Sequence, residues 1–342
     1  MLLALVSSFF DPGGVMLLIY PGARSMGMGG AYGAAYRDPL AMYYNIGSLA
    51  FAPEAAMSFS IYRWLPALKD DMLYEHGALW VPTRYGNFGF HQTWLYGGEF
   101  DVYDEYGNYR GKYSPYDLEL TLGYGKRITP YIGAGLGLKY FHSYFAPDWV
   151  MREILGEPGG GTARVFTGDL GLLAAYPDWG LSAGFSFNNL LGRVDYTPST
   201  PSTWDPMPKY YRFAAAWKVI EFPVLSCLFA YQMDRDMVSG PTETWHAYGT
   251  EFSFLRFLYL RWGHFRDDEG QRVGNTFGTG VEIGPFAFDV SQSPIYAFGE
   301  SDTRFTLTLR NTMEIPFMRP DFFRKGRKRI LFFSFQQEAA PG

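Results

Sequence analysis

Side chains that could perform catalysis or bind a metal ion are few and widely scattered in this chain. The five histidines stand at positions 76, 91, 142, 246 and 264, and their spacing matches no common zinc-binding motif. The single cysteine, Cys227, lies in the apolar run VLSCLFAY and cannot form an internal disulfide. We therefore expect no catalytic residues, no metal site, no cofactor and no enzymatic activity. An enzyme with a Ser–His pair assembled across strands is the residual alternative.

The most unusual stretch is the glycine- and alanine-rich segment 22–45, which reads GARSMGMGGAYGAAYRDPLAMYYN. A dinucleotide-binding loop would also be rich in glycine. However, GMGGAY lacks the third glycine of that fingerprint, and no strand pattern precedes it. The segment has neither a helical nor a strand pattern, so its role must depend on the elements around it.

The composition points to a β-protein with one apolar and one polar surface. Aromatic residues make up 19% of the 342 residues and charged residues only 18%, and there are 40 glycines. No apolar run reaches the roughly 18 residues of a membrane-spanning helix. The formal net charge of −5 gives no reason to expect nucleic acid as a partner.

Apolar and polar residues alternate along much of the chain, which predicts half-buried strands. In RFTLTLR, for example, Phe305, Leu307 and Leu309 fall on one face. The segments with this pattern are 55–65, 73–82, 87–103, 115–127, 131–145, 164–177, 181–194, 209–220, 223–235, 246–254, 256–267, 272–284, 286–298 and 303–315. Their lengths are close to the roughly 9–11 residues that a tilted strand needs to cross a bilayer.

Short and long connections alternate between these segments. Tight turns occur at 177–180 and 284–285, whereas 146–163 and 195–208 are long. This pattern predicts an all-β fold: a transmembrane antiparallel barrel of about 14 strands in the outer membrane of a Gram-negative (diderm) bacterium, in contact with its lipid. A soluble β-sandwich is less favoured, because its strands should be shorter and its outer face more charged. Aromatic residues gather at the strand ends, as at Tyr62, Trp80 and 140–145, which is typical of interface girdles.

We divide the chain into an N-terminal segment 1–53, a barrel 54–316 and a basic, solvated periplasmic tail 317–342. The first residues, MLLALVSS, resemble the end of a truncated secretion signal. A barrel of this size leaves a water-filled hole unless something fills it. We predict that segment 22–45 folds into the lumen from the short-turn side as a plug, since its glycines permit positive φ and close approach to the wall. Asp169 and Asp289 are expected to face the lumen as wall residues that are solvated or paired with arginine, in preference to a role in proton relay.

Residues 17–51, LLIYPGARSMGMGGAYGAAYRDPLAMYYNIGSLAF, resemble the N-terminal signature of the PorV/PorQ family, relatives of the FadL-like long-chain fatty-acid transporters. The matching positions are Arg24, Gly27, Met28, Gly29, Gly30, Ala31, Asp38, Tyr44, Asn45, Leu49 and Ala50. The departure is Ile46-Gly47, where the family has Pro-Ala. The closing strands also resemble the family, at Gly263, Gly278, Gly280, Asp289 and Arg304-Phe305. The resemblance implies a 14-stranded barrel with an N-terminal hatch that contains Arg24, Gly27, Gly29, Gly30, Asp38, Tyr44 and Asn45.

Two functions follow from the resemblance. The PorV branch implies a type IX secretion component that binds secreted cargo proteins through its extracellular loops and works with a larger translocon. The FadL-like branch implies a transporter of fatty acids or other hydrophobic small molecules, with the ligand in the lumen. We favour secretion, because the inward columns of the strands carry glycine and charge, which argues against an apolar pocket.

Loop 146–163 is the candidate surface for a protein partner. Its apolar residues are Trp149, Val150, Met151, Ile154 and Leu155. Such side chains are costly to expose without a partner, and WVMREIL has roughly helical spacing. The alternative is that this loop folds back over the mouth of the barrel as a lid.

Overall fold

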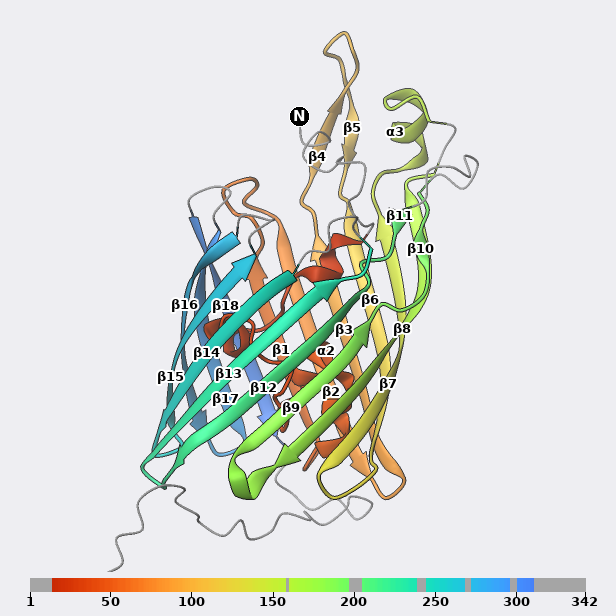
Figure 1. The fold of residues 1–342 in the computed structure, drawn as a ribbon. Helices are drawn as coiled ribbons and strands as arrows, with labels where there is room; N and C mark the ends of the chain where they lie inside the picture. Colours follow the sequence, from red (N-terminus) through yellow and green to blue (C-terminus); the bar gives the residue numbers. More distant parts are fainter. Residues whose placement is uncertain are drawn as a thin grey trace, which may run out of the picture.

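The computed structural model describes residues 14–157, 160–196, 205–238, 244–267, 272–295 and 300–310. Within these residues, fourteen antiparallel strands close into one barrel around the N-terminal segment (Figure 1). The strands are β1 (Ala56–Arg63), β2 (Leu73–Thr83), β3 (Gly86–Tyr96), β6 (Tyr116–Arg127), β7 (Ile132–Tyr144), β8 (Thr162–Tyr176), β9 (Leu181–Asn188), β12 (Tyr210–Glu221), β13 (Leu225–Asp236), β14 (Thr244–Phe254), β15 (Leu258–Asp267), β16 (Arg272–Ile283), β17 (Phe286–Ile295) and β18 (Glu300–Arg310). Each strand pairs with its neighbours in this order, and β1 pairs with β18 to close the ring.

Each of the fourteen predicted segments overlaps one barrel strand, so the predicted antiparallel barrel of about 14 strands is confirmed. Two predicted segments are interrupted. The segment 87–103 breaks after β3, and β4 (Phe100–Tyr103) then pairs with β5 (Tyr109–Tyr113) as a separate hairpin. The segment 181–194 breaks after β9, and β10 (Arg193–Val194) pairs with β11 (Asp205–Pro206). The breaks coincide with positive φ angles, 82° at Gly98 and 55° at Asn189, which a strand cannot accommodate.

The barrel wall has an apolar outer face and a polar inner face. On β18, Phe305 and Leu307 are 42% and 49% exposed, whereas Thr306 between them is 2% exposed. The exposed apolar residues recur on every strand of the wall, which is the distribution of a barrel that crosses a membrane. The soluble-sandwich alternative is therefore wrong. Among the described residues, no helix is long and apolar enough to cross a membrane.

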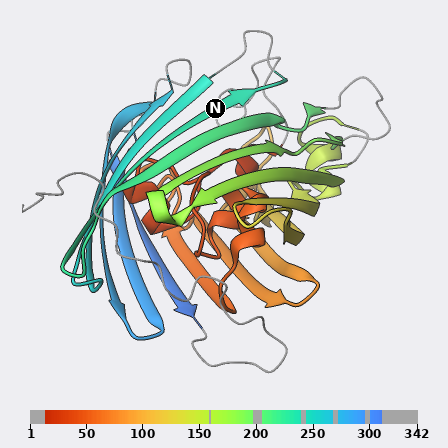
Figure 2. The same cartoon turned by 60° about the horizontal axis from the view of Figure 1, so that its bottom comes forward.

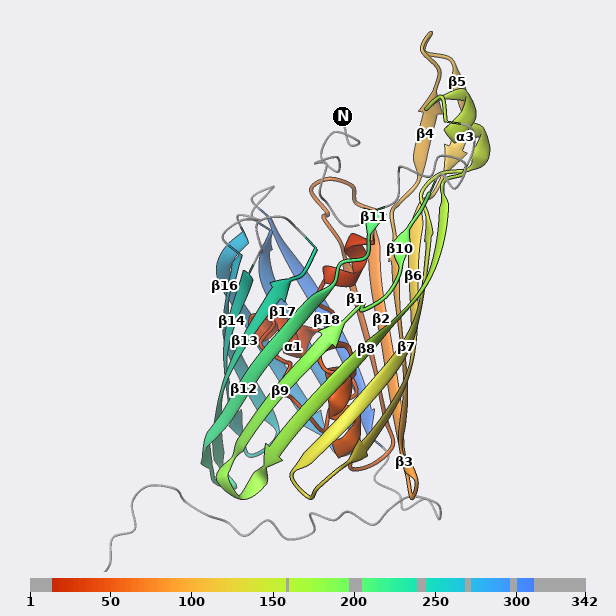
Figure 3. The same ribbon diagram turned by 45° about the vertical axis from the view of Figure 1, so that its right-hand side comes forward.

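The two rims of the barrel differ. One rim carries tight turns, such as η4 (Pro177–Trp179) between β8 and β9. At the other rim, the β4–β5 hairpin and helix α3 (Asp148–Glu153) project together beyond the barrel (Figures 1 and 3). We refer to the hairpin and α3 as the projecting module.

The N-terminal segment lies inside the barrel, as the view from the short-turn end shows (Figure 2). Its elements are η2 (Val15–Leu18), α1 (Ala23–Gly27), α2 (Ala41–Tyr44) and η3 (Ile46–Phe51). Residues 16 and 17 pack near the long-loop end, against Tyr62 and Phe141. At the opposite end, Arg127 Nε donates a hydrogen bond to the carbonyl of Ala50 (3.2 Å), just before β1 begins. The segment thus runs the length of the lumen, and its described part does not enter from the short-turn side as expected. The predicted signal remnant before residue 14 and the basic tail 317–342 lie outside the described residues.

Candidate functional site

The N-terminal segment is held in the lumen by wall side chains that bind its backbone. The amide of Ala23 donates to Thr306 Oγ1 (2.8 Å), that of Gly29 to Thr276 Oγ1 (3.0 Å), and that of Gly33 to Gln232 Oε1 (2.8 Å). Irregular backbone at membrane depth is stable only when its polar groups find partners inside the protein. The inward threonine and glutamine residues of β13, β16 and β18 provide such partners.

The predicted plug glycines lie where the segment touches the wall most closely. Gly29 has φ 67°, and a Cβ at this position would come within 2.8 Å of the backbone of His264. A Cβ on Gly27 would lie 3.0 Å from the Cα of Gly278, a glycine of β16. Gly30 has φ 88°. Small residues on both sides therefore let the two backbones pack directly against each other.

Arg24 joins a buried cluster of five charged residues, which we call the Arg24 cluster. Its guanidinium lies 3.0 Å from the carboxylate of Glu251 and 3.3 Å from that of Asp38. Glu251 also pairs with Arg261 (2.7 Å), and Arg261 pairs with Asp289 (2.7 Å). The structure thus brings together Arg24 and Asp38, both marked by the resemblance, with Glu251 and Arg261, two wall residues that the sequence did not single out. Asp289 is the arginine-paired wall residue that we expected, whereas Asp169 pairs with Lys139 (2.9 Å).

A second set of ion pairs binds the chain on both sides of Arg24, because Arg212 also donates to the carbonyl of Tyr44 (2.7 Å). Arg212 binds Asp234 through two nitrogens (2.7 and 2.6 Å), and the hydroxyl of Tyr20 also donates to Asp234. Arg304 pairs with Asp302 (2.6 Å) and donates to the carbonyl of Tyr20. The alternation of the strands could have identified these wall residues as inward. Their partners in the N-terminal segment could not be read from spacing.

Tyr44 and Asn45 fix the turn between α2 and η3. The Oδ1 of Asn45 accepts from the amide of Gly47 (2.9 Å), and its Nδ2 donates to the carbonyls of Gly33 (3.1 Å) and Leu172 (2.9 Å). The hydroxyl of Tyr44 donates to the carbonyl of Pro21 (2.9 Å). Asn45 therefore ties the segment to itself and to β8, although the proline of the family signature is replaced here by Ile46.

A group of apolar side chains lies at the long-loop end of the lumen, with the ion pair of Arg304 and Asp302 against its Tyr62. We name this region the apolar chamber. It consists of Met16, Leu17, Tyr62, Tyr74, Leu95, Phe141, Ala163, Val165, Val194 and Met207. The chain's own Met16 and Leu17, 1% and 2% exposed, fill it. The inward side chains of this region are apolar, unlike the glycine and charge on which the expectation of a lumen without an apolar pocket rested.

Several aromatic residues near strand ends were misassigned by position alone. Tyr62, Trp80 and Phe141 are at most 2% exposed and point inward, so they do not belong to an interface girdle. Strand-end position does not distinguish the two faces. The parity of each residue within its strand does, and it was the signal that could have revealed the chamber.

Two histidines form a buried polar pair beside the N-terminal segment. The rings of His76 and His91 lie 5.5 Å apart, and the edges of both approach the ring of Tyr43. His91 Nδ1 lies 3.3 Å from Glu119 Oε2, without the alignment of a hydrogen bond. Thr93 Oγ1 links His76 (3.0 Å) to Glu119 (3.0 Å). No group of three or more histidine, cysteine or acidic side chains in the described part of the chain is arranged to hold a metal ion.

A serine motif that resembles a hydrolase nucleophile site has a structural role here. Residues 180–184 read GLSAG, a formal match to Gly-x-Ser-x-Gly. The nucleophile motif requires a strand followed by a sharp turn into a helix. Here Ser182 follows a tight turn and lies in β9, and its hydroxyl donates to the carbonyl of Ala34 (2.9 Å). Ser182 therefore anchors the N-terminal segment.

The candidate partner-binding residues of loop 146–163 lie in the projecting module. Val150 and Met151 are buried in a small core with Val102 of β4, and Trp149 and Ile154 are partly buried beside them. Leu155 is 36% exposed. The β4–β5 hairpin covers most of this apolar surface, so these five residues do not form one exposed patch. At the base of the hairpin, the backbone N–H of Glu99 donates to Asp71 and lowers the pKa of that carboxyl.

Comparison with known proteins finds relatives by fold alone. No family model matches the chain, and no curated protein matches its sequence. The solved structure of the P. putida toluene transporter TodX is 13% identical, with 86% of this chain and 99% of that chain covered at a TM-score of 0.55. The Ralstonia pickettii toluene transporter TbuX is 14% identical, with 84% and 98% covered at a TM-score of 0.53. A deletion mutant described as the TodX monoaromatic hydrocarbon channel is 13% identical, with 84% and 97% covered and the same TM-score of 0.53. The chain thus has the barrel fold of these hydrocarbon transporters.

Proposed function

We propose that the protein is an outer-membrane transporter for hydrophobic small molecules, held closed by its own N-terminal segment. The observation that carries this proposal is the apolar chamber at the long-loop end of the lumen, which the chain's own Met16 and Leu17 occupy. Ligand sites are typically concave and mostly apolar. The shared fold with transporters of toluene supports the same substrate class, to which fatty acids also belong chemically. An apolar outer wall supports placement in an outer membrane.

The position of the N-terminal segment explains how such a transporter would be closed. Met16 and Leu17 fill the chamber, the guanidinium of Arg304 lies over the ring of its Tyr62, and the Arg24 cluster lies further toward the short turns. An apolar molecule gains nothing from contact with these charges. It must displace residues 16 and 17 to occupy the chamber, and it must move the segment further to leave the barrel on the other side.

Uptake into vesicles tests this proposal. We expect Phe141→Ser and Val165→Ser, which place hydroxyls in the chamber, to reduce uptake of a radiolabelled monoaromatic hydrocarbon or fatty acid into barrel-containing liposomes. Leu155→Ser is the matched control, because it makes the same type of change on the projecting module. Equal uptake by all three variants and the unmodified protein would overturn the proposal.

A second candidate function, secretion of proteins of the type IX kind, rests on the projecting module. The β4–β5 hairpin exposes Tyr103, Tyr106 and Tyr109, with Tyr106 82% exposed. Exposed tyrosines are common in protein recognition surfaces. Under this function, Tyr106→Ser would reduce the amount of secreted protein that co-purifies with the barrel and leave hydrocarbon uptake unchanged.

A further inference from the structure

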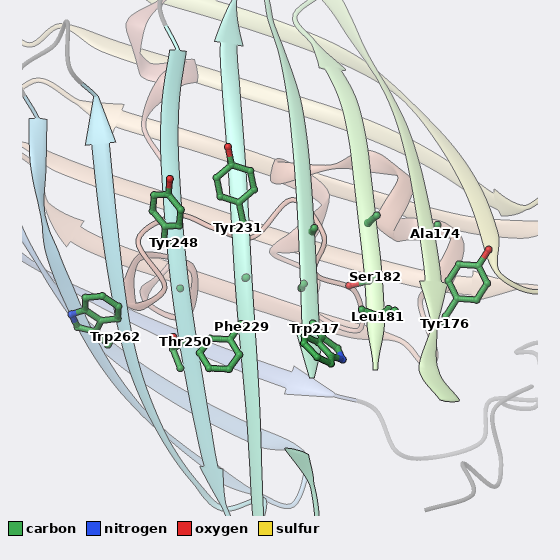
Figure 4. Close-up of a pocket in the computed structure, with 15 residues that line it drawn as sticks. Ala174, Tyr176, Leu181, Ser182, Trp217, Phe229, Tyr231, Tyr248, Thr250 and Trp262 are labelled. Atoms are coloured by element: carbon green, nitrogen blue, oxygen red, sulfur yellow. The ribbon is translucent and has the colours of Figure 1, made fainter. Parts of the chain in front are cut away.

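The outer surface of the barrel contains an apolar groove unrelated to the lumen. It extends over β8, β9, β12, β13, β14 and β15 and encloses a volume of about 690 Å³ (Figure 4). Its residues are Ala174, Tyr176, Leu181, Ser182, Ala183, Ala215, Ala216, Trp217, Phe229, Ala230, Tyr231, Tyr248, Gly249, Thr250 and Trp262. None of these residues carries a full charge.

The floor of the groove results from strand register. Ala174 of β8 pairs with Ala183 of β9, and Ala183 pairs with Ala215 of β12. Directly opposed residues of neighbouring strands point to the same face of a sheet. The three alanines therefore form a continuous row of small side chains on the outer face.

The row of residues beside this floor has large side chains. Leu181 pairs with Trp217, and Trp217 pairs with Phe229, so these three side chains stand next to one another. They are 40–48% exposed. On the floor row itself, Tyr231 follows Ala215 and is followed by Tyr248. The result is a trough one row wide, with an aromatic wall along one side and tyrosines toward one end.

We propose that this groove binds one hydrocarbon chain of a membrane phospholipid. The surface around it is the apolar outer face of the barrel, so the medium that meets it in a membrane is acyl chain. The hydroxyl of Ser182 turns inward to Ala34, and that of Tyr231 hydrogen-bonds His246 (3.0 Å), so the groove offers few polar groups to a protein partner. The alanine row is lower than the large side chains beside it. An acyl chain in the groove makes the dispersion contacts that this row would otherwise lack.

The length and direction of the groove fit one leaflet. Its alanine floor crosses the two strand spacings from β8 to β12, about 10 Å, and its lining residues together cross the five spacings from β8 to β15, about 24 Å. Barrel strands tilt by roughly 35–45°, so a row across them is inclined by roughly 45–55° to the membrane normal and descends about 14–17 Å. One leaflet of hydrocarbon is about 15 Å deep. At the short-turn end, the ring of Tyr176 stacks on that of Tyr131 (4.9 Å), as expected where a chain meets its headgroup.

Filling the floor tests the proposal. The double variant Ala183→Leu/Ala215→Leu occupies the trough with side chains. Thr279→Leu is the matched control, because Thr279 is an exposed small residue on β16, outside the groove. After extraction from membranes in mild detergent, native mass spectrometry should find a phospholipid retained by the unmodified protein and by Thr279→Leu, and lost from the double variant. Folding is checked by heat-modifiable gel mobility.

Two results would overturn the proposal. One is equal lipid retention by the double variant and the control. The other is an unmodified protein that is a dimer in detergent and becomes monomeric only in the double variant, because the occupant would then be a second copy. If the double variant does not fold, phospholipids brominated along the acyl chain provide the test. They should quench the fluorescence of the unmodified protein measurably more than that of Trp217→Phe, and equal quenching would contradict a chain in the groove.

Discussion

At the scale of single residues, two properties hold the N-terminal segment in the barrel: the small size of its glycines and the buried charges of its ion pairs. Where it touches the wall, glycine is required because a side chain would collide with backbone. Where it crosses the lumen, arginine and acidic residues pair with one another in largely buried positions. Both requirements lead to predictions that can be tested one residue at a time.

Gly29→Ala should weaken the packing of the N-terminal segment against the barrel wall. The new Cβ would lie 2.8 Å from backbone atoms of His264, and the φ of 67° is itself unfavourable for alanine. Together these effects should cost about 1–3 kcal/mol. Protease sensitivity of residues 20–50 in the folded barrel is the measurement. Gly77→Ala is the matched control, since a Cβ there meets nothing closer than 3.6 Å. Similar behaviour of the two variants would contradict the close packing described for Gly29.

Glu251→Gln should destabilise the protein strongly. Glu251 bridges Arg24 and Arg261, and its replacement by glutamine removes the carboxylate that both guanidinium groups contact and leaves each with one acidic partner, Asp38 or Asp289. Removal of one partner of a buried ion pair typically costs about 3–5 kcal/mol. The transition temperature in heat-modifiable gel mobility should fall clearly. Arg110→Gln, which breaks the exposed pair with Glu153, should leave that temperature nearly unchanged. A Glu251→Gln variant as stable as Arg110→Gln would show that the Arg24 cluster adds little.

At the scale of elements, the projecting module has a small core separate from the barrel. Val102, Val150 and Met151 join the hairpin to α3, and the ion pair of Arg110 with Glu153 (2.8 Å) bridges them at the surface. The module can therefore lose its packing without affecting the ladder of the wall.

Met151→Ser should unfold the module and leave the barrel intact. The substitution removes a side chain that is only 4% exposed, and comparable truncations cost about 2–5 kcal/mol. We expect faster proteolysis between residues 100 and 157 with unchanged gel mobility of the barrel. Leu155→Ser, at the exposed edge of the same loop, should resist proteolysis like the unmodified protein. Loss of barrel mobility in Met151→Ser would show that the module and the barrel fold as one unit.

At the scale of the whole molecule, the two rims should face opposite sides of the membrane. Short turns of outer-membrane barrels face the periplasm and long loops face outward. An epitope inserted at Gly107, in the β4–β5 turn, should therefore be reached by antibody on intact cells. One inserted at Asp178, in η4, should be reached only after the outer membrane is permeabilised. The reverse labelling pattern would invert the orientation, and labelling of both on intact cells would argue against insertion in an outer membrane.

The sequence by itself determined the wall of the barrel. Alternation in RFTLTLR and in thirteen other segments is a local property, because a strand sends successive side chains to opposite faces whatever surrounds it. The alternation of tight and long connections then determined the two rims. The helical spacing of WVMREIL likewise predicted α3, since i to i+3 and i+4 contacts need no distant partner. Glycines at 27, 29 and 30 marked a close approach but did not identify the surface approached.

Only the tertiary structure decided what fills the barrel and how. Arg24 meets Glu251 across 227 positions of sequence, and Ala23 meets Thr306 across 283. No periodicity connects residues so far apart, because their proximity arises only when the ring closes and its interior is occupied. The same reason applies to the apolar chamber, to which seven elements contribute one or two residues each, and to the direction in which the N-terminal segment crosses the lumen. The groove on the outer wall also required strand register. Alanines at 174, 183 and 215 are unremarkable along the chain and become neighbours only when β8, β9 and β12 pair.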